Sequence, residues 1–522
     1  MDALAERRQQ GAGLRAEKQA KPRGLNFNND FLTGALGVII LAMSFRNLRD
    51  LIKALEKKDW LRRIKTEVSS ELEISEIYDR VVKKAGPALL FEKVKGSAFP
   101  VLINAFGSME RMAFALGEKS LDDVARRFED LANLPAPEGL MEKARLVPKL
   151  LELANLPPKV VGKAPCQEVV MQNPDLSILP ALKCWPFDRG RYLTLPIVLT
   201  RSPKSGTRNL GMYRMQIYDR KTTGMHWHPH KGGAQHYREA EMMNKPLPVA
   251  VALGGSPALI FSASAPVPEG IDEYLFAGFL QGEAVEVVKG KTVDLEVPAE
   301  AEIILEGYVE PKERRLEGPF GDHTGFYSLP DEYPVFHLTG ITHRRDAIYP
   351  ATVVGRPVME DCFMAKAAER IFLVFLKKIF PEIVDLALPA EGIFHNYAFV
   401  SIDKRYPGHA YKIMHGLWGL GQMMFFKWIV VFDRGVNVQD TSEVLWRLGN
   451  NIDPARDIIF TKGPADVLDH AAPRPGLGAK IGVDATRKWK EEGFEREWPE
   501  EIRMTEEIKE LVSKRWKDYG ID

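Results

Sequence analysis

The stretch between Cys166 and His343 constrains the fold most strongly. Short β-branched segments follow one another there, separated by Gly, Pro and Asn, and they include LTLPIVLT, MYRMQIYDR, PVAVALG, AVEVVKG, AEIILEGYV and VFHLTGITHR. Strands of this length at this spacing, with few helical stretches between them, are typical of an antiparallel sheet that curls into a barrel. The sequence therefore predicts a barrel-like β domain at the centre of the chain.

Helices and strands alternate on both sides of this centre. Before it, FRNLRDLIKALEKK places its Leu and Ile residues on one helical stripe, and ALLFEKV and PVLINAF have the pattern of strands. After it, helical patterns alternate with the strand-like YAFVSID and WIVVFD. Such alternation predicts an α/β domain on each side. We place the domains at residues 43–160, 161–345 and 346–522, with the Pro-rich LPPKVVGKAP at the first boundary.

Residues 1–42 differ from the rest of the chain. A long start rich in Arg, Lys, Gln and Ala precedes the apolar run FLTGALGVIILAM. A membrane helix needs about 20 apolar residues, so this run is too short to span a bilayer. A signal peptide is an open alternative, although no small-residue cleavage site precedes SFRNLRD. We favour an upstream extension, either disordered or outside the true start, with the folded protein beginning at Met43.

Bulk composition indicates an ordinary globular protein with enough residues for two or three cores. The 522 residues are 45% hydrophobic and 27% charged, with a formal net charge of +0. No excess of charge indicates nucleic acid or a membrane surface as a partner. The three cysteines are far apart and form no CxxC pair, so a disulfide framework and a cysteine zinc site are both disfavoured. These features fit a reducing, cytoplasmic setting.

Two carboxylates and an arginine are the first candidates for chemistry. Glu317 and Asp322 flank the tight turn of LEGPFGDHTG, which could bring the two carboxylates together at one opening of a site. Two nearby carboxylates drive their pKa values apart, leaving one protonated as an acid. An exposed acidic turn is the plainer alternative, which the adjacent His323 weakens. Arg214 stands among apolar neighbours in MYRMQIY and, if buried, needs an anion, either a substrate acid or a structural salt-bridge partner.

The segment GMHWHPHKGGAQH is the second candidate. His226, His228 and His230 alternate, so on a strand they would share one face. The spacing lacks the pattern of a zinc site, and packing or hydrogen bonding is the simpler role for these rings. The Lys-Gly-Gly turn that follows could present backbone N–H groups to a phosphate, which is a weak indication by itself. Spacing does not connect the distant Asn209 and Glu273 to these histidines.

From about Met43 to the C-terminus, the chain resembles the UbiD family of decarboxylases, which use prenylated FMN. The resemblance rests on NLGMYRMQ, HKGGA, PVAVALGG, APVPEGIDEYLFAGFL, VDLEVPAEAEIILEGY, EGPFGDHTG, YPATVVGRP, PEIVDLALP, YPGHA and LGAKIGVDATRKW. It implies a multidomain α+β protein, with an N-terminal α/β domain, a central split β-barrel that binds the flavin, and a C-terminal α/β domain that mediates oligomerisation.

The resemblance also implies three sets of site residues. The family binds Mn²⁺ or Mg²⁺, with K⁺ nearby, and the positions of its metal ligands correspond to Asn209, His230 and Glu273. The cofactor contacts correspond to Met212, Tyr213, Arg214, His226, Trp227, His228, Lys231, Gly232 and Lys427. The catalytic network corresponds to Glu317, Arg214 and Asp322. An oxygen-rich ligand set with one imidazole suits Mn²⁺ or Mg²⁺ better than Zn²⁺.

The implied reaction is the non-oxidative decarboxylation of an aromatic acid through a covalent adduct with prenylated FMN. Departure of CO₂ from an aromatic carbon leaves electrons without a good acceptor, so an external electron sink is required. Arg214 is expected to orient the carboxylate, and Asp322 or Glu317 to deliver a proton to the carbon. Asp322 is favoured because it occupies the position of the family's proton donor.

The expected substrate comes from quinone biosynthesis, because MYRMQ and TTGMHWHPHKGGA resemble that branch most. It would be the prenylated dihydroxynaphthoate of menaquinone or the 4-hydroxy-3-polyprenylbenzoate of ubiquinone. Small phenolic, heteroaromatic or cinnamic acids stay open, and remoter alternatives are a two-carboxylate hydrolase and a noncatalytic flavin-binding protein. Expected partners are a flavin prenyltransferase that supplies the cofactor, further copies of the chain in a dimer or hexamer, and a membrane surface if the substrate is prenylated.

Overall fold

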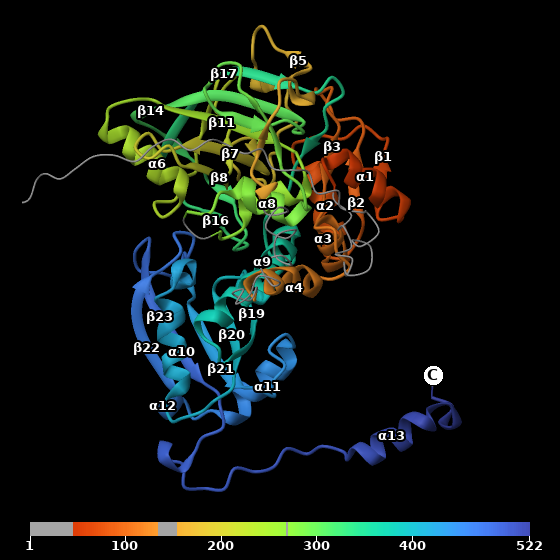
Figure 1. Cartoon of the computed structure of the whole chain (residues 1–522), viewed down its shortest axis with the longest axis vertical. Helices are drawn as coiled ribbons and strands as arrows, with labels where there is room; N and C mark the ends of the chain where they lie inside the picture. The colour runs from red at the N-terminus through yellow and green to blue at the C-terminus, as the bar shows by residue number, and fades with distance from the viewer. Residues whose placement is uncertain (1–44, 134–153, 268–269, 522) are drawn as a thin grey trace, which may run out of the picture. The chain divides into compact units, whose positions relative to one another are not determined.

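The computed structural model describes residues 45–133, 154–267 and 270–521. The extension 1–42, including its apolar run, lies outside these residues. A mixed α+β architecture is observed, with separate sheets in the N-terminal, central and C-terminal parts of the chain (Figure 1). The predicted fold class is therefore confirmed. Within the described part of the chain, no helix combines the length and the apolar character that a membrane span requires.

The N-terminal part is a four-stranded sheet with helices packed against it. The strands run in the order β1 (Leu61–Ile64), β2 (Ala88–Phe91), β3 (Val101–Ile103) and β18 (Tyr349–Pro350). The helices are α1 (Leu48–Lys57), α2 (Glu73–Val82), α3 (Met109–Ala115) and α4 (Leu121–Ala132). Asn47 caps α1 by accepting from the Asp50 N–H, and the predicted leucine stripe of this helix is buried. The last sheet strand comes from beyond residue 345.

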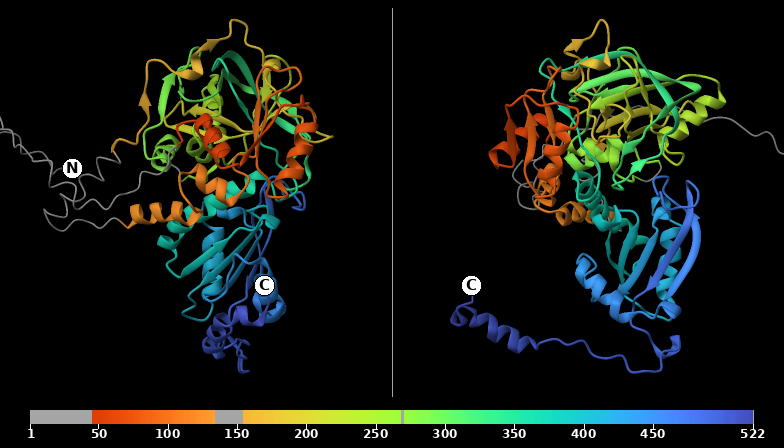
Figure 2. Two further views of the ribbon diagram at one scale, coloured as in Figure 1. Left: turned by 90° about the vertical axis from the view of Figure 1, so that its right-hand side faces the viewer. Right: turned by 180° about the vertical axis from the view of Figure 1, so that it is seen from behind.

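The central part is a curled antiparallel sheet of seven strands (Figure 2). Its order is β10 (Thr222–Gly224), β17 (Asp331–His343), β14 (Ile303–Glu317), β11 (Leu247–Leu253), β7 (Pro196–Arg201) and β8 (Arg208–Met212), with β5 (Val169–Val170) paired to β17. The long strands β14 and β17 shift register twice, between Glu306 and Gly307 and between Val309 and Arg314. Such bulges bend a strand and increase its twist, which suits a closed sheet. The barrel-like sheet predicted from the sequence is thus observed.

Smaller elements of the central part surround this sheet. Three short sheets pair β6 (Tyr192–Leu193) with β9 (Met215–Gln216), β15 (Phe320–Gly321) with β16 (Tyr327–Ser328), and β12 (Glu286–Lys289) with β13 (Glu296–Pro298) and β4 (Lys159–Val160). The helices are α6 (Gly232–Met242), α7 (Pro257–Ser264) and α8 (Glu273–Gln281). Of these, α6 packs on β7, β8 and β14, and α8 lies against α7 and β8.

The C-terminal part is a five-stranded sheet with helices. Its strands run in the order β19 (Ile383–Ala387), β20 (Tyr397–Ile402), β21 (Trp428–Asp433), β23 (Leu477–Asp484) and β22 (Ile458–Pro464). The middle three strands are parallel and the edge strands are antiparallel to them. The helices are α9 (Glu360–Ile379), α10 (His409–Trp418), α11 (Thr441–Asn451), α12 (Pro454–Asp457) and α13 (Glu506–Lys514). Apolar clusters cover both faces of the sheet, so this part has its own core.

Candidate functional site

Arg214 lies in the break between β8 and β9 and is the centre of the site. Its Nε donates to Glu317 Oε1 at 2.9 Å, and its Nη2 donates to Glu317 Oε2 at 3.2 Å. Its Nη1 donates to Asp322 Oδ2, and Nη2 also reaches Ser328 Oγ at 3.2 Å. The guanidinium carbon stands 4.6 Å from the centroid of the Phe320 ring. A buried guanidinium is thus held by two carboxylates and an aromatic face.

The turn after β14 brings the two carboxylates together. Strand β14 ends at Glu317, and Gly318 follows with a φ of +89°, a conformation that favours glycine. The short hairpin of β15 and β16 then begins, and Asp322 comes directly after β15. Glu317 and Asp322 expose only 1% and 5% of their side chains. The expectation that this turn gathers both carboxylates is met, and the alternative of an exposed acidic turn is wrong.

Two polar residues that the sequence analysis did not single out hold this turn. Gln216 accepts from the Gly318 N–H at 2.9 Å, and Asp188 accepts from the Gly321 N–H at 2.7 Å. Asp188 also accepts from the N–H groups of Cys184 and Trp185, at 3.0 and 2.8 Å. No motif or periodicity marks these side chains in the sequence, because the groups of the turn that they bind are more than a hundred residues away.

The pKa values of the two carboxylates depart from the sequence-based expectation. Burial alone raises the pKa of both, but the charge of Arg214 overrides it. The pKa of Glu317 falls to about 2, with a further contribution from His226, and the pKa of Asp322 falls well below its usual value, with a further contribution from His323. The expected separation into one acid and one base is therefore wrong for this state, because one cation lies between the two carboxylates.

The three histidines follow β10 in an irregular segment rather than lying on a strand, which corrects the expectation of a shared strand face. His226 contacts Glu317 Oε2 through Nδ1 at 3.1 Å and His228 Nε2 through its own Nε2 at 2.7 Å. Its ring lies 4.2 Å from that of Tyr333. Burial lowers the pKa of both His226 and His228, that of His228 to about 2. These two rings therefore extend the Arg214 cluster as neutral imidazoles.

The residues expected to hold a metal come together only in part. Glu273 begins α8 and accepts from the Leu210 N–H at 3.1 Å, beside Asn209. Asn209 Oδ1 lies only 2.0 Å from where a Cβ on Gly232 would be, so it sits against the Lys-Gly-Gly turn. His230 precedes this turn, is exposed, and lies 4.6 Å from the Phe425 ring. Burial raises the pKa of Glu273 to about 7, against the lowering effects of its backbone hydrogen bonds and of the Arg208 charge.

Carboxylate and imidazole groups do not form a metal site by themselves. Among the described residues, no group of three or more His, Cys, Asp and Glu side chains is placed to hold an ion. The three expected ligands include an amide, and a phosphate oxygen from a cofactor would have to complete the shell. The donor set fits a hard cation such as Mn²⁺ or Mg²⁺ under that condition.

The Lys-Gly-Gly turn starts a helix against the same strand. Lys231 is the N-cap of α6, and its Nζ donates to Gln422 at 3.2 Å. A Cβ on Gly233 would lie 2.6 Å from Trp227 Nε1, a buried nitrogen with no hydrogen-bond partner among the described residues. An unpartnered buried N–H beside the first turn of a helix, whose N–H groups have no partner within the helix, fits an anionic or polar ligand.

The remaining expected cofactor contacts lie on two parts of the chain. Met212 ends β8, and Tyr213, which follows it, is buried in the hydrophobic core. Lys427 precedes β21 in the C-terminal part, and its Nζ forms an ion pair with Asp469 at 2.9 Å. Its contact with a cofactor phosphate stays a prediction.

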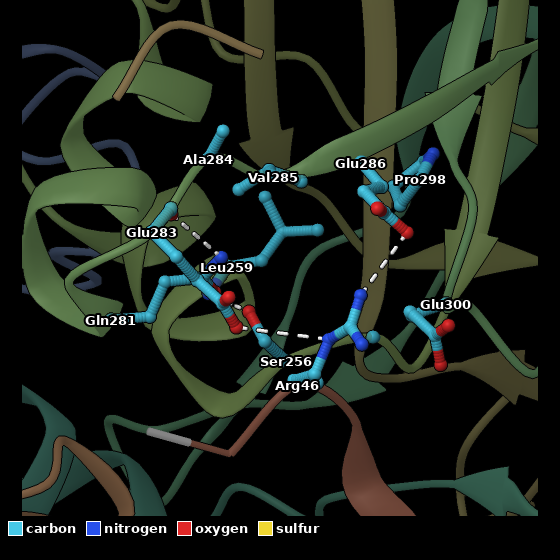
Figure 3. A pocket seen from close by; sticks show the side chains of 11 residues that line it. Arg46, Ser256, Leu259, Gln281, Glu283, Ala284, Val285, Glu286, Pro298 and Glu300 are labelled. Atoms are coloured by element: carbon cyan, nitrogen blue, oxygen red, sulfur yellow. Dashed lines mark hydrogen bonds and ion pairs between the residues drawn. The ribbon is translucent and has the colours of Figure 1, made fainter. Parts of the chain in front are cut away.

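A separate pocket lies near α7 and α8, away from these residues (Figure 3). Arg46 stands between Glu283 and Glu286, at 3.7 and 3.2 Å, and Glu300 lines the same pocket. Figure 3 shows the arginine side chain extending between the two carboxylates to which the dashed lines connect it. Because these charges are already paired, the pocket offers no reactive group.

Comparisons with known proteins identify the family. Three models for domains of 3-octaprenyl-4-hydroxybenzoate carboxy-lyase match the chain: the N-terminal domain at residues 52–131, the Rift-related domain at 159–357 and the C-terminal domain at 362–485. A protein of Aquifex aeolicus (strain VF5), itself uncharacterized, is 51% identical over 486 residues, which are 92% of this chain and 100% of that protein. The chain belongs to the UbiD family of decarboxylases.

Solved structures of UbiD-class enzymes share this fold. Vanillic acid decarboxylase of Sedimentibacter hydroxybenzoicus in its closed form is 30% identical, with a TM-score of 0.81, over 91% of this chain and 99% of that one. HmfF of Pelotomaculum thermopropionicum in complex with FMN is 29% identical, with a TM-score of 0.72, over 87% and 97%. An evolved dimeric form of HmfF contains prFMN. The family predicted from the motifs is confirmed, while the quinone-pathway branch stays a prediction.

Proposed function

We propose that this UbiD-family protein removes CO₂ from an aromatic acid with the help of prenylated FMN. The single observation that carries the proposal is the buried Arg214 held between Glu317 and Asp322. One cation between two carboxylates can turn one side to a substrate carboxylate while the other side stays paired. The cofactor assignment is supported by the FMN and prFMN bound in HmfF structures.

The residues of this chain then have separate tasks. Arg214 orients the substrate carboxylate through the Nη1 side that it now turns to Asp322, while its Nε and Nη2 stay bonded to Glu317. Asp322 delivers a proton to the carbon that CO₂ leaves, and Glu317 with His226 keeps Arg214 aligned. Prenylated FMN, when bound, supplies the electron sink that an aromatic carbanion requires. The low exposure of the cluster excludes competing water.

The cofactor phosphate belongs at the Lys-Gly-Gly turn in this proposal. α6 starts there, so that the positive end of its dipole faces the turn, and Lys231 adds a positive charge. Mn²⁺ or Mg²⁺ would be held by Asn209, His230 and Glu273 together with phosphate oxygens, and K⁺ would bind nearby. Met212, Tyr213, His226, Trp227, His228 and Gly232 are the proposed contacts of the flavin, and Lys427 a further contact at its phosphate end.

A prenylated substrate from quinone biosynthesis is favoured by the surface around the catalytic turn. Phe326 and Leu329 expose 58% and 86% of their surface, and Phe187 exposes 73%. The Phe187 and Tyr327 rings lie 5.5 Å apart, and Phe326 and Leu329 belong to the same short segment that follows Asp322. Clustered exposed apolar residues indicate a binding surface, and an isoprenoid tail would cover them. A small phenolic acid, such as vanillic acid, would leave this area bare.

Co-expression with a flavin prenyltransferase tests the reaction. Protein purified from the co-expressing strain should show a flavin-like absorbance and release CO₂ from an aromatic acid, whereas protein made without the prenyltransferase should not. The substrate panel should contain prenylated hydroxybenzoate, prenylated dihydroxynaphthoate and unprenylated phenolic acids. Colourless protein without flavin or metal under both conditions would contradict the proposal, and equal rates on vanillic acid and its prenylated analogue would contradict the quinone role.

A further inference from the structure

His323 contacts the proposed proton donor from the side opposite Arg214. Its Nδ1 lies 3.0 Å from Asp322 Oδ1, and its backbone N–H donates to the same oxygen at 2.8 Å. Its Nε2 is buried and has no hydrogen-bond partner among the described residues. The side chain is 22% exposed overall, so part of the ring still reaches solvent.

Asp361, at the start of α9, is a second buried acid that the proposed reaction does not use. Its Oδ1 is buried and has no partner within the described part of the chain. Burial raises the pKa of Asp361 to about 6, and the charge of His323 acts against this rise. An unpaired carboxylate oxygen and an unpaired imidazole nitrogen are costly inside a protein unless they are used.

The charges of three carboxylates act on the His323 ring. Asp322 contacts the ring directly, and Asp361 of α9 and Asp466 of the loop after β22 act on it without a hydrogen bond. The rings of Phe394 and His395 lie 5.4 and 5.3 Å away. Burial lowers the pKa of His323, but the three carboxylates override it, so that the net pKa is raised and the ring is more often charged at neutral pH.

Decarboxylation creates a need that this ring can meet. The balanced reaction converts RCO₂⁻ and one H⁺ into RH and CO₂, so each turnover consumes a proton. Asp322 is held ionised by Arg214, and it therefore has no proton to give until one is supplied. We propose that His323 holds the proton that Asp322 delivers, and that Asp361 keeps the imidazole charged. This inference rests on the proposed decarboxylase function.

The proton moves in two short steps. As Arg214 turns to the substrate carboxylate, Asp322 loses its cationic partner and takes the proton from His323 Nδ1. Asp322 then gives this proton to the substrate carbon, so that a C–H bond replaces the C–C bond that broke when CO₂ left. After product release, the neutral imidazole regains a proton from water at Nδ1, the nitrogen that gave its proton to Asp322. His323 acts through Asp322 and is a positioning residue, not a group that touches the substrate.

His323→Asn tests the first half of the proposal. The amide can still donate to Asp322 but cannot carry a proton, so kcat at neutral pH should fall about a hundredfold, with KM changed less than about threefold. His337→Asn is the matched control, because His337 also pairs with a carboxylate, Glu313, on the remote strand β17. Wild-type kcat with an unchanged pH profile in His323→Asn would overturn the proposal.

Asp361→Asn tests the second half. Activity needs the charged ring and is lost as pH rises through the pKa of His323, so removal of a nearby negative charge should shift this loss about one pH unit lower. Asp346→Asn serves as the control, because Asp346 is largely exposed and pairs with Arg49. If the loss of kcat at high pH occurs at the same pH in Asp361→Asn as in the wild type, Asp361 does not keep the His323 imidazole charged.

Nitrogen NMR of ¹⁵N-histidine-labelled full-length protein measures the protonation of the His323 ring without any turnover. The His323 signal is assigned by its loss in His323→Asn. The ring should titrate above the ordinary histidine pKa, and its midpoint should fall in Asp322→Asn and in Asp361→Asn. A ring that is already neutral at pH 6 would overturn the inference even if the protein is an active decarboxylase. Absence of CO₂ release by the wild-type protein would instead contradict the proposed function. The titration would then still test whether His323 is held in its charged form.

Discussion

The Arg214 cluster and the expected metal ligands both lie next to β8, yet they differ in how their charges are balanced. In the Arg214 cluster, two buried carboxylates share one guanidinium, and the pKa of each is lowered. At the expected metal ligands, Glu273 accepts from a backbone N–H, and its pKa is raised to about 7. Burial raises the pKa of all three carboxylates. The difference comes from Arg214, whose charge overrides burial at Glu317 and Asp322, whereas the charge of Arg208 does not override it at Glu273.

Replacement of Arg214 should have the largest effect, because the whole cluster depends on its charge. Arg214→Met leaves two buried carboxylates facing each other, and we expect a loss of about 3–5 kcal/mol in the free energy of unfolding. Turnover should fall at least about a thousandfold. Chemical denaturation and CO₂ release measure both. Arg315→Met is the control, because Arg315 is half exposed and should cost less than about 1 kcal/mol; equal losses in both variants would break the contrast.

Asp322→Asn should remove the chemistry and leave binding intact. The amide keeps the size of the side chain but cannot transfer a proton, so kcat should fall about a hundredfold to ten-thousandfold. Flavin absorbance after purification and the affinity for substrate should stay near wild type, because the proposed cofactor contacts lie on other residues. Loss of bound flavin in this variant would assign Asp322 to cofactor binding instead.

The pH dependence of stability should have opposite signs at the two places. The pKa of Glu273 is raised from 4.5 to about 7, so in metal-free protein its ionisation weakens folding as pH rises across that window. Glu273→Gln should therefore be more stable than metal-free wild type by about 1–3 kcal/mol at pH 8, and Mn²⁺ should stabilise only the wild type. The pKa of Glu317 is lowered to about 2, so its contribution is present above pH 4.5 and is lost as pH falls toward 2.

Thermal unfolding across pH 3–8 checks both signs. Glu283→Gln is the matched control for Glu273, because it changes a carboxylate that is 46% exposed and paired with Arg46. A metal-free Glu273→Gln protein that is less stable than wild type at pH 8 would show that the carboxylate already has a cation among the residues of the chain.

His230→Gln should have the smallest effect. The ring is exposed, and burial with the charge of Lys231 already lowers its pKa to about 4, so it is neutral and free to bind a metal at pH 7. Loss of one neutral ligand should weaken Mn²⁺ binding about tenfold to a hundredfold. Isothermal titration with Mn²⁺ measures this loss, and unchanged affinity would remove His230 from the ligand set.

Much of the architecture is readable from local pattern. The leucine stripe of α1, the strands β2, β3, β20 and β21, and the alternating elements around α9 and α10 match the predicted segments. The strand β1 is not visible in the local pattern, because Leu61–Ile64 closely follows a helix and becomes a strand by pairing with β2.

The sequence alone determined the family and the mixed α+β class, because long motifs and strand periodicity are local properties of the chain. Through the family resemblance it also predicted Arg214, Glu317 and Asp322 as one group. Only the tertiary structure decided how these groups are charged. Asp188, Gln216 and His323 contact the turn from Glu317 to Asp322, and Arg214 lowers the pKa of both carboxylates at once. Electrostatic energies depend on distance and burial, which spacing along the chain does not contain.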